Sequence, residues 1–283
     1  MTSSSTSSSG THPLDEALQL AAASEPGQYE GHTHPAYWNM VGPFGGVTAA
    51  TFVQAILQHP QRLGDPVSIT VNYAGAVAEG AFIVQATPVR TNRSTQHWNL
   101  AIVQKDAAGT ESVVTTGTAV TAVRRTTWGV TDQPMPPVSR PAENQTLAFP
   151  SGAVAWINRY EMKLITGNIP PAWDGSGDNS LTQMWVRDTP ARPLDFCALT
   201  ALADVFFPRV WLRRALPVSA GTVSMTVYFH AGAEQLAATG TGFLLAQARG
   251  QEFRNGFFDQ TAQLWNEAGT LLATSHQIVY YKE

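Results

Sequence analysis

Two segments of the chain are apolar on every side of a helix. Residues 47–57 carry no charge, and within the second helix, predicted from about 195 to 207, the span Phe196–Phe207 contains only Thr200 and Asp204 as polar residues. A helix that is apolar all round is buried rather than amphipathic. Segments dense in β-branched and alternating residues follow each helix and predict antiparallel strands. The predicted strands cover 67–74, 81–90, 95–105, 111–123, 154–164, 181–187, 221–230, 236–248, 254–266 and 270–281.

The order of one apolar helix and then antiparallel strands occurs twice. An Ala-Gly-Thr turn at 108–110 in the first half is repeated at 268–270 in the second, and this indicates an internal duplication. A short helix is expected within 13–24, and the stretch rich in Pro between the halves predicts a linker. The predicted organisation is a disordered Ser/Thr tail over 1–12, one α+β unit over 13–125, a linker over 126–152 and a second unit over 153–283.

Composition narrows the class of protein. The chain has 283 residues with 17 basic and 21 acidic side chains, so it lacks the basic surface that nucleic acid requires. Its single cysteine, Cys197, excludes an internal disulfide and a cysteine-based zinc site. Charged residues make up only 13%, which predicts apolar surface buried in a homo-oligomer or a ligand tunnel. Without a long apolar run or a secretory signal, we expect no membrane span and a cytoplasmic location.

Five short motifs follow one another along the chain: Phe44-Gly45-Gly46, Gln183–Arg187, Leu202-Ala203-Asp204, Gly221–His230 and Leu272–Gln277. In their order and spacing they resemble the acyl-CoA thioesterase II (TesB-like) family. That resemblance implies a double hot-dog fold, in which two curved antiparallel sheets each wrap a long buried helix and join across a pseudo-dimer. It also implies hydrolysis of an acyl-CoA to the free acid and CoA, with no metal and no other cofactor.

The resemblance also implies a catalytic set. The family places an Asp, a Thr and a Gln around a water, and these fall on Asp204, Thr222 and Gln277. Two positions depart from the family pattern, because Ser224-Met225 stands where an Asp-His pair is expected and Ala203 where a Ser is expected. These departures bear on the acyl pocket and leave the substrate open.

The residues themselves support this chemistry. An Asp near the C-terminal end of an apolar helix is disfavoured by the dipole and by desolvation, so a functional role competes with a polar residue that simply reaches solvent. A buried Asp204 could serve as general base, while Thr222 and Gln277 could hold its water or be ordinary strand residues. Backbone N–H groups at Gly45 and Gly46 could bind the thioester carbonyl, or the glycines could form a tight turn.

Other features refine the expectation. Thr200 lies four residues before Asp204, so both share a helix face, and we count Thr200 with Gly45 and Gly46 as substrate-binding candidates. The first helix carries no acid, which predicts one working site per chain. A hot-dog hydratase or dehydratase, with His230 as the nearby strand histidine, and a non-catalytic acyl-thioester binding protein remain alternatives. The sequence leaves open the acyl group and whether CoA or a carrier protein bears it.

Overall fold

The computed structural model describes residues 11–149 and 152–282. Within this part of the chain, the two buried helices and most strands follow one another in the predicted order, whereas α4 and α5 are additional helices. The α-helices are α1 (Pro13–Ala17), α2 (Gly45–Leu57), α3 (Phe196–Leu202), α4 (Arg209–Arg214) and α5 (Ala233–Thr239), and the 3-10 helices are η1 (Pro35–Tyr37), η2 (Pro141–Glu143) and η3 (Ala155–Arg159). The strands of the first half are β1 (Ala21–Ala22), β2 (Gln28–His32), β3 (Asp65–Tyr73), β4 (Ala81–Thr91), β5 (Thr95–Lys105) and β6 (Glu111–Ala122). Those of the second half are β7 (Tyr160–Thr166), β8 (Thr182–Asp188), β9 (Ser219–Phe229), β10 (Leu244–Arg249), β11 (Phe253–Arg254), β12 (Phe257–Asn266) and β13 (Leu271–Lys282).

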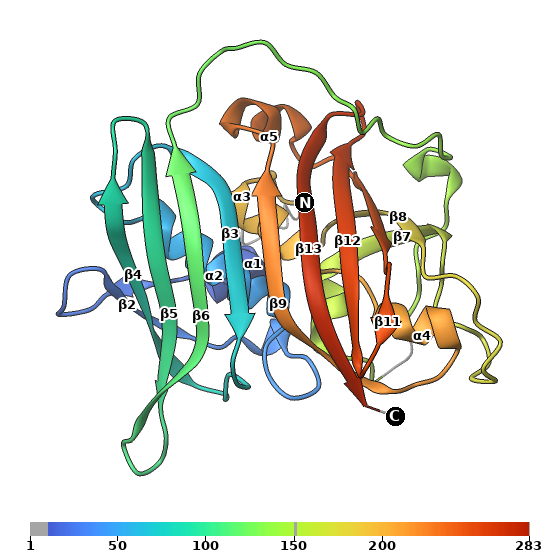
Figure 1. Cartoon of the computed structure of the whole chain (residues 1–283), viewed down its shortest axis with the longest axis horizontal. Coiled ribbons are helices and arrows are strands. Elements are labelled where there is room, and N and C mark those ends of the chain that lie inside the picture. Colours follow the sequence, from blue (N-terminus) through green and yellow to red (C-terminus); the bar gives the residue numbers. More distant parts are fainter. Residues whose placement is uncertain (1–10, 150–151, 283) are drawn as a thin grey trace, which may run out of the picture.

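One antiparallel sheet of 13 strands runs through both halves of the molecule (Figure 1). Its order is β1-β2-β4-β5-β6-β3-β9-β13-β12-β10-β8-β7, with β11 paired to β12. The halves join where β3 pairs with β9, from Ser68 opposite Tyr228 to Asn72 opposite Ser224. At this seam the hydroxyls of Thr70 and Thr226 lie 2.9 Å apart. The two predicted sheets therefore do join across the pseudo-dimer.

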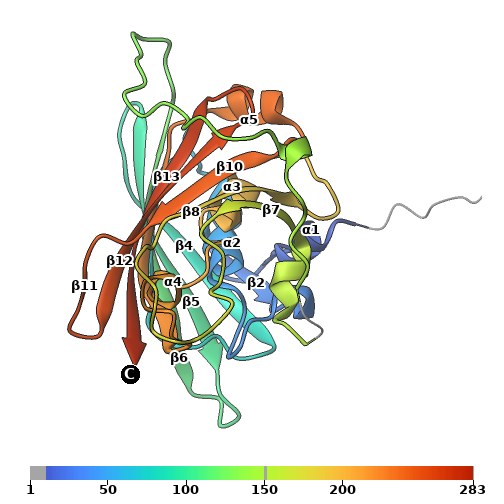
Figure 2. The same cartoon turned by 90° about the vertical axis from the view of Figure 1, so that its right-hand side faces the viewer.

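Helices α2 and α3 pack against each other on one side of the curved sheet (Figure 2). Nearly every residue of α2 is buried, and all seven residues of α3 are buried, as their apolar sequences predict. The second helix is shorter than the predicted 195–207, because it ends at Leu202. Ala203 and Asp204 continue it as a turn, and Pro208 disfavours helical geometry at the residue before it.

Three predicted elements differ from the structure. The segment 236–248, predicted as one strand, divides into the end of α5 and strand β10. Ala, Glu and Gln favour the helix there, and the Gln235 side chain caps its start by accepting from the Gly232 N–H at 2.9 Å. The strand expected over 154–164 begins only at Tyr160, after η3. The helix expected within 13–24 ends at Ala17, and the chain then forms β1 against β2.

The N-terminal tail and the linker have specific neighbours where they are described. Residues 1–10 of the predicted disordered tail lie outside the described residues, whereas the His12 side chain caps α1 by accepting from the Leu14 N–H. The linker passes along the second half, where Trp185 donates to the Ser139 carbonyl at 2.8 Å and Trp265 to the Gln133 carbonyl at 3.1 Å. Residues 150 and 151 of the linker also lie outside the described part.

Candidate active site at the crossing of the two helices

Helices α2 and α3 run in opposite directions, so that Gly46 at the start of α2 lies against Ala201 near the end of α3. A Cβ atom placed on Gly46 would lie 2.6 Å from the backbone oxygen of Ala201, which is shorter than real contacts allow. At the other end of the crossing, the Cys197 thiol donates to the Gln54 side-chain oxygen at 3.5 Å. Glycine at position 46 therefore permits the N-terminus of α2, from the first half, to meet the C-terminal end of α3, from the second half.

Asp204 lies at this meeting point, in the turn after α3. The Gln277 amide nitrogen donates to Asp204 Oδ1 at 2.8 Å, and the Gly46 backbone N–H also bonds to the carboxylate. A Cβ on Gly45 would lie 2.7 Å from Asp204 Oδ2. The predicted residues Asp204, Gln277, Gly45 and Gly46 are thus brought together, although they come from both halves of the chain.

The surroundings of Asp204 change its acid strength. Part of the residue can be reached by solvent, but the carboxylate itself is enclosed by protein. This burial raises the pKa of Asp204 to about 7, while the hydrogen bonds from Gln277 and from the Gly46 N–H act in the lowering direction. A carboxyl with this pKa is ionised in a large fraction of molecules near neutral pH and is basic enough to accept a proton from water.

Thr222 reaches the site because strand β9 carries a bulge. Met225 lies opposite Gln277 and Ser224 opposite Ile278, yet the next residue of β13, Val279, lies opposite Thr222. Val223 is left over as the extra residue and points outward. Without this bulge, the alternation of the strand would turn Thr222 to the outer face together with Ser224.

The bulge places Thr222 on the same face as Gln277. The Thr222 hydroxyl donates to the Gln277 Oε1 atom at 3.3 Å, so both ends of the Gln277 amide are held. A second contact of the amide nitrogen, at 3.4 Å, is with the Met225 sulfur. Thr222 fixes the orientation of Gln277, and Gln277 fixes that of Asp204.

Two residues that the sequence reasoning did not single out also hold the site. The Ser275 hydroxyl donates to the Ala203 carbonyl at 3.2 Å and so ties the Asp204 turn to strand β13. The Tyr73 hydroxyl donates to the Gly45 carbonyl at 2.9 Å. The sequence could have pointed to Ser275, because it precedes Gln277 by two residues and therefore lies on the same face of the strand.

Thr200 is placed differently from the other candidates. It is fully buried, and its hydroxyl donates to the Phe196 carbonyl at 2.6 Å within its own helix. Among the described residues, no hydrogen bond joins Thr200 to Asp204 or to Gln277. In this structure the contacts of Thr200 are those of a helix core residue.

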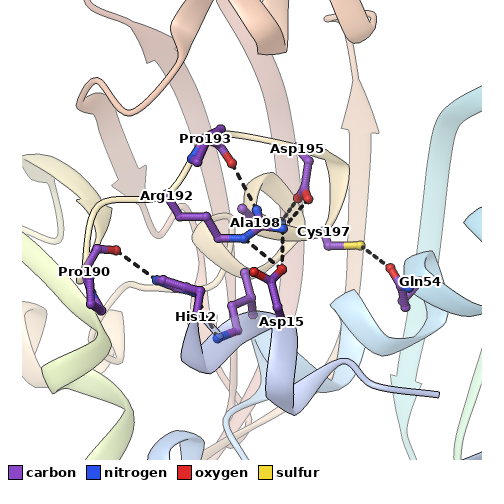
Figure 3. Close-up of polar contacts among 10 residues, drawn as sticks. His12, Asp15, Gln54, Pro190, Arg192, Pro193, Asp195, Cys197 and Ala198 are labelled. Atoms are coloured by element: carbon purple, nitrogen blue, oxygen red, sulfur yellow. Dashed lines mark hydrogen bonds and ion pairs between the residues drawn. The ribbon is translucent and has the colours of Figure 1, made fainter. Parts of the chain in front are cut away.

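The pseudo-symmetric end of the crossing has different chemistry (Figure 3). There Asp195 caps α3 by accepting from the Ala198 N–H at 2.8 Å, and Arg192 bonds to both Asp195 at 2.6 Å and Asp15 at 2.7 Å. Gln54, not an acid, faces this end of α3. The adjoining cleft, of about 830 Å³, carries acidic side chains on its wall, including Asp15, Asp195 and Glu30.

Some other chemistries find no support in the described residues. Burial raises the pKa of the Cys197 thiol well above its usual range, so it stays protonated, as expected of a core thiol. In residues 11–149 and 152–282, no three His, Cys, Asp or Glu side chains come together in a way that could hold a metal ion. In the same residues, the helices are too short or too polar to cross a membrane.

Comparison with known proteins agrees with this architecture. Residues 34–122 match the family model of the acyl-CoA thioesterase N-terminal domain, and residues 132–281 match that of the C-terminal domain. No curated protein matches the chain in sequence.

Solved structures resemble the whole chain. A conserved protein of unknown function with a hot dog fold, from Alicyclobacillus acidocaldarius, is 43% identical, with a TM-score of 0.89 over 97% of this chain and 99% of the other. An acyl-CoA thioesterase II from Mycobacterium marinum is 16% identical, with a TM-score of 0.74 over 95% and 98%. A tesB protein from Mycobacterium avium subs paratuberculosis is 15% identical, with a TM-score of 0.75 over 96% and 100%. With both family models matched in order along one chain that folds as a double hot dog, this protein belongs to the acyl-CoA thioesterase family.

Proposed function

We propose that this protein hydrolyses an acyl-CoA to the free acid and CoA, with Asp204 as the general base. The observation that carries this proposal is the enclosed carboxyl of Asp204, whose pKa is raised to about 7 and whose orientation is fixed by Gln277. The nearby N-terminus of α2 supports it, because backbone N–H groups and the helix dipole favour negative charge on a thioester oxygen.

The reaction would proceed in two steps. Asp204 takes a proton from a water held near Thr222 and Gln277, and the water oxygen attacks the thioester carbonyl carbon. The carbonyl oxygen becomes an oxyanion at the N-terminus of α2, where Gly45 supplies a backbone N–H, since the Gly46 N–H already bonds to Asp204. The tetrahedral intermediate then collapses, the C–S bond breaks, and the CoA thiolate leaves with the electron pair. Asp204 returns its proton to that sulfur, which restores the carboxylate.

We propose a single working site in each chain. The second end of the helix crossing has Gln54 where the first has Asp204, and the Asp195 carboxylate occupies the start of α3. An amide cannot accept a proton from water, and the acidic side chains of the adjoining cleft would repel the phosphates of CoA. The low charged fraction of 13% supports a homo-oligomer. The single reduced cysteine is consistent with a cytoplasmic enzyme of fatty acid metabolism.

The alternatives have less support in the geometry. A hot-dog hydratase or dehydratase would pair a histidine with the acid, but the His230 ring bonds to the Thr274 hydroxyl at 3.0 Å. Within the described residues, the hydrogen bonds to Asp204 come from Gln277 and Gly46 and not from a histidine. A non-catalytic acyl-thioester binding protein would not require a carboxyl whose pKa is raised to about 7.

The test is release of CoA thiol from short, medium, long and aromatic acyl-CoAs by wild type and Asp204→Asn. We expect wild-type turnover that falls about a hundredfold or more in the variant. The matched control is Asp188→Asn, because burial raises the pKa of Asp188 also to about 7 although it lies outside the site. Turnover that survives Asp204→Asn would refute the assigned base. Hydration of enoyl-CoA without thiol release would indicate the hydratase, and binding without either reaction the binding protein.

A further inference from the structure

Tyr73 is the last residue of β3 and reaches from the sheet to the first turn of α2. Its hydroxyl donates to the Gly45 carbonyl at 2.9 Å. A Cβ atom on Gly45 would lie 3.4 Å from that hydroxyl and 2.7 Å from Asp204 Oδ2. The phenol, the first peptide of the helix and the carboxylate therefore surround one point that has no room for a methyl group.

The hydroxyl of Tyr73 remains a donor at every pH at which Asp204 works. Burial, and after it the negative charge of Asp204, hold the pKa of Tyr73 well above its usual range. Tyr73 therefore does not act as a base, and its hydroxyl proton stays in the hydrogen bond to the Gly45 carbonyl. This excludes a proton-transfer role and leaves a role through geometry.

The position of β3 connects the Tyr73 contact to both halves of the chain. β3 is the strand of the first half that pairs with β9 of the second, and β9 carries Thr222. The helix turn that Tyr73 holds presents the Gly46 N–H to Asp204, which belongs to the second half. One end of the contact is thus fixed to the seam of the sheet and the other to the hydrogen bond on the carboxylate.

We propose that Tyr73 is a positioning residue that keeps the first turn of α2 seated on Asp204 and so holds the general base in its reactive state. This inference rests on the proposed function, since it explains how the first half of the chain controls a base supplied by the second. Without the hydroxyl, the turn is free to move away from the carboxylate. The Gly46 N–H then stabilises the ionised form less, and Asp204 becomes a weaker acid.

The experiment is Tyr73→Phe, compared with wild type in two measurements. The first is the pH dependence of thiol release. We expect kcat about tenfold lower. We also expect the midpoint of the pH profile to be higher by about 0.5 to 1 pH unit, because this shift corresponds to part of the free energy that one hydrogen bond to a charged group contributes. The second does not require turnover. Unfolding curves are measured across pH for wild type, Asp204→Asn, Tyr73→Phe and the double variant. The difference in stability between each protein with Asp204 and its Asp204→Asn counterpart then gives the pH at which Asp204 titrates, with and without the Tyr73 hydroxyl.

The matched control is Tyr160→Phe. Tyr160 is a buried tyrosine whose pKa is also raised in part by the charge of Asp204, but its hydroxyl has no hydrogen-bond partner among the described residues. It should leave the midpoint unchanged. If the loss of any phenol hydroxyl near Asp204 were sufficient, the Asp204 midpoint would shift equally in Tyr73→Phe and Tyr160→Phe. That result would overturn the proposal.

The outcomes separate the two proposals. An unchanged midpoint in Tyr73→Phe, with kcat of the wild type, overturns the role of Tyr73 and leaves the thioesterase intact. Absence of turnover from wild type on all acyl-CoAs overturns the proposed function. In that case the unfolding curves still decide about Tyr73, because a raised Asp204 midpoint in Tyr73→Phe alone would support its positioning role.

Discussion

Replacing Asp204 by Asn should stabilise the protein at alkaline pH while it lowers turnover about a hundredfold or more. The folded protein raises the pKa of Asp204 from 3.8 to about 7. Between these values the folded state keeps a proton that the unfolded state has lost, so stability falls as pH rises and the full penalty is present above pH 7. Asn cannot ionise and avoids that penalty.

The magnitude follows from the two pKa values. At about 1.36 kcal/mol per pH unit, the penalty above pH 7 reaches about 4 kcal/mol, of which about 1 kcal/mol is already present at about pH 4.5. The advantage of Asp204→Asn should therefore grow by about 3 kcal/mol between about pH 4.5 and pH 8. Because solvent reaches part of the residue, this is an upper value. The Asn amide that faces the Gly46 N–H adds an offset that does not depend on pH.

The assay is urea unfolding of wild type and variant across this pH range, together with thiol release. The matched control Asp188→Asn should show a similar change of stability with pH, since burial raises the pKa of Asp188 to about 7, but it should keep wild-type turnover. Wild-type kcat should rise with pH through about 7, where Asp204 ionises. Parallel stability curves for wild type and Asp204→Asn would refute the reasoning, because they would show that Asp204 does not titrate differently in the folded state.

Three further predictions concern the neighbours of Asp204 and the second end of the helix crossing. Gly45→Ala should lower kcat at least about tenfold in a thiol-release assay, since its Cβ would lie 2.7 Å from Asp204 Oδ2, and unchanged kcat would contradict that geometry. Thr222→Val should lower kcat about tenfold with the fold retained by circular dichroism, because Gln277 loses the donor that orients it, whereas Thr222→Ser should keep most of the activity. Arg192→Ala should reduce the free energy of unfolding by about 1–2 kcal/mol without lowering turnover per folded molecule, and a loss of turnover would argue for a working second site.

The sequence defined the elements wherever local pattern decides structure. The apolar run of α2 indicated a buried helix, and the alternating β-branched segments indicated strands with one face inside. The repeated order of helix and strands indicated two copies of one unit. The pattern predicted one strand over 236–248, but the structure has the end of a helix and then a strand there. No change in the apolar periodicity marks the boundary between these two elements.

The site was only partly accessible from the sequence. Asp204 stood out because a carboxylate in an apolar segment is costly unless it has a function. Thr222 and Gln277 came from the family resemblance, and nothing local distinguishes them from other strand residues. Tyr73 could not be found in this way, because its contact with Gly45 joins a strand end to a helix start 28 residues away.

Tertiary structure alone decided what these residues do to one another. The bulge at Val223 turns Thr222 inward, and a single extra residue in one strand leaves no mark in a pattern of alternation. The raised pKa of Asp204 results from its enclosure by both halves of the chain, which outweighs the lowering effect of the bonds from Gln277 and Gly46. The sequence determined which segments must be buried, since burial follows from local hydrophobicity. The chemistry of the site depends on distances between residues far apart in the chain, and only the joined sheet and the crossed helices set those distances.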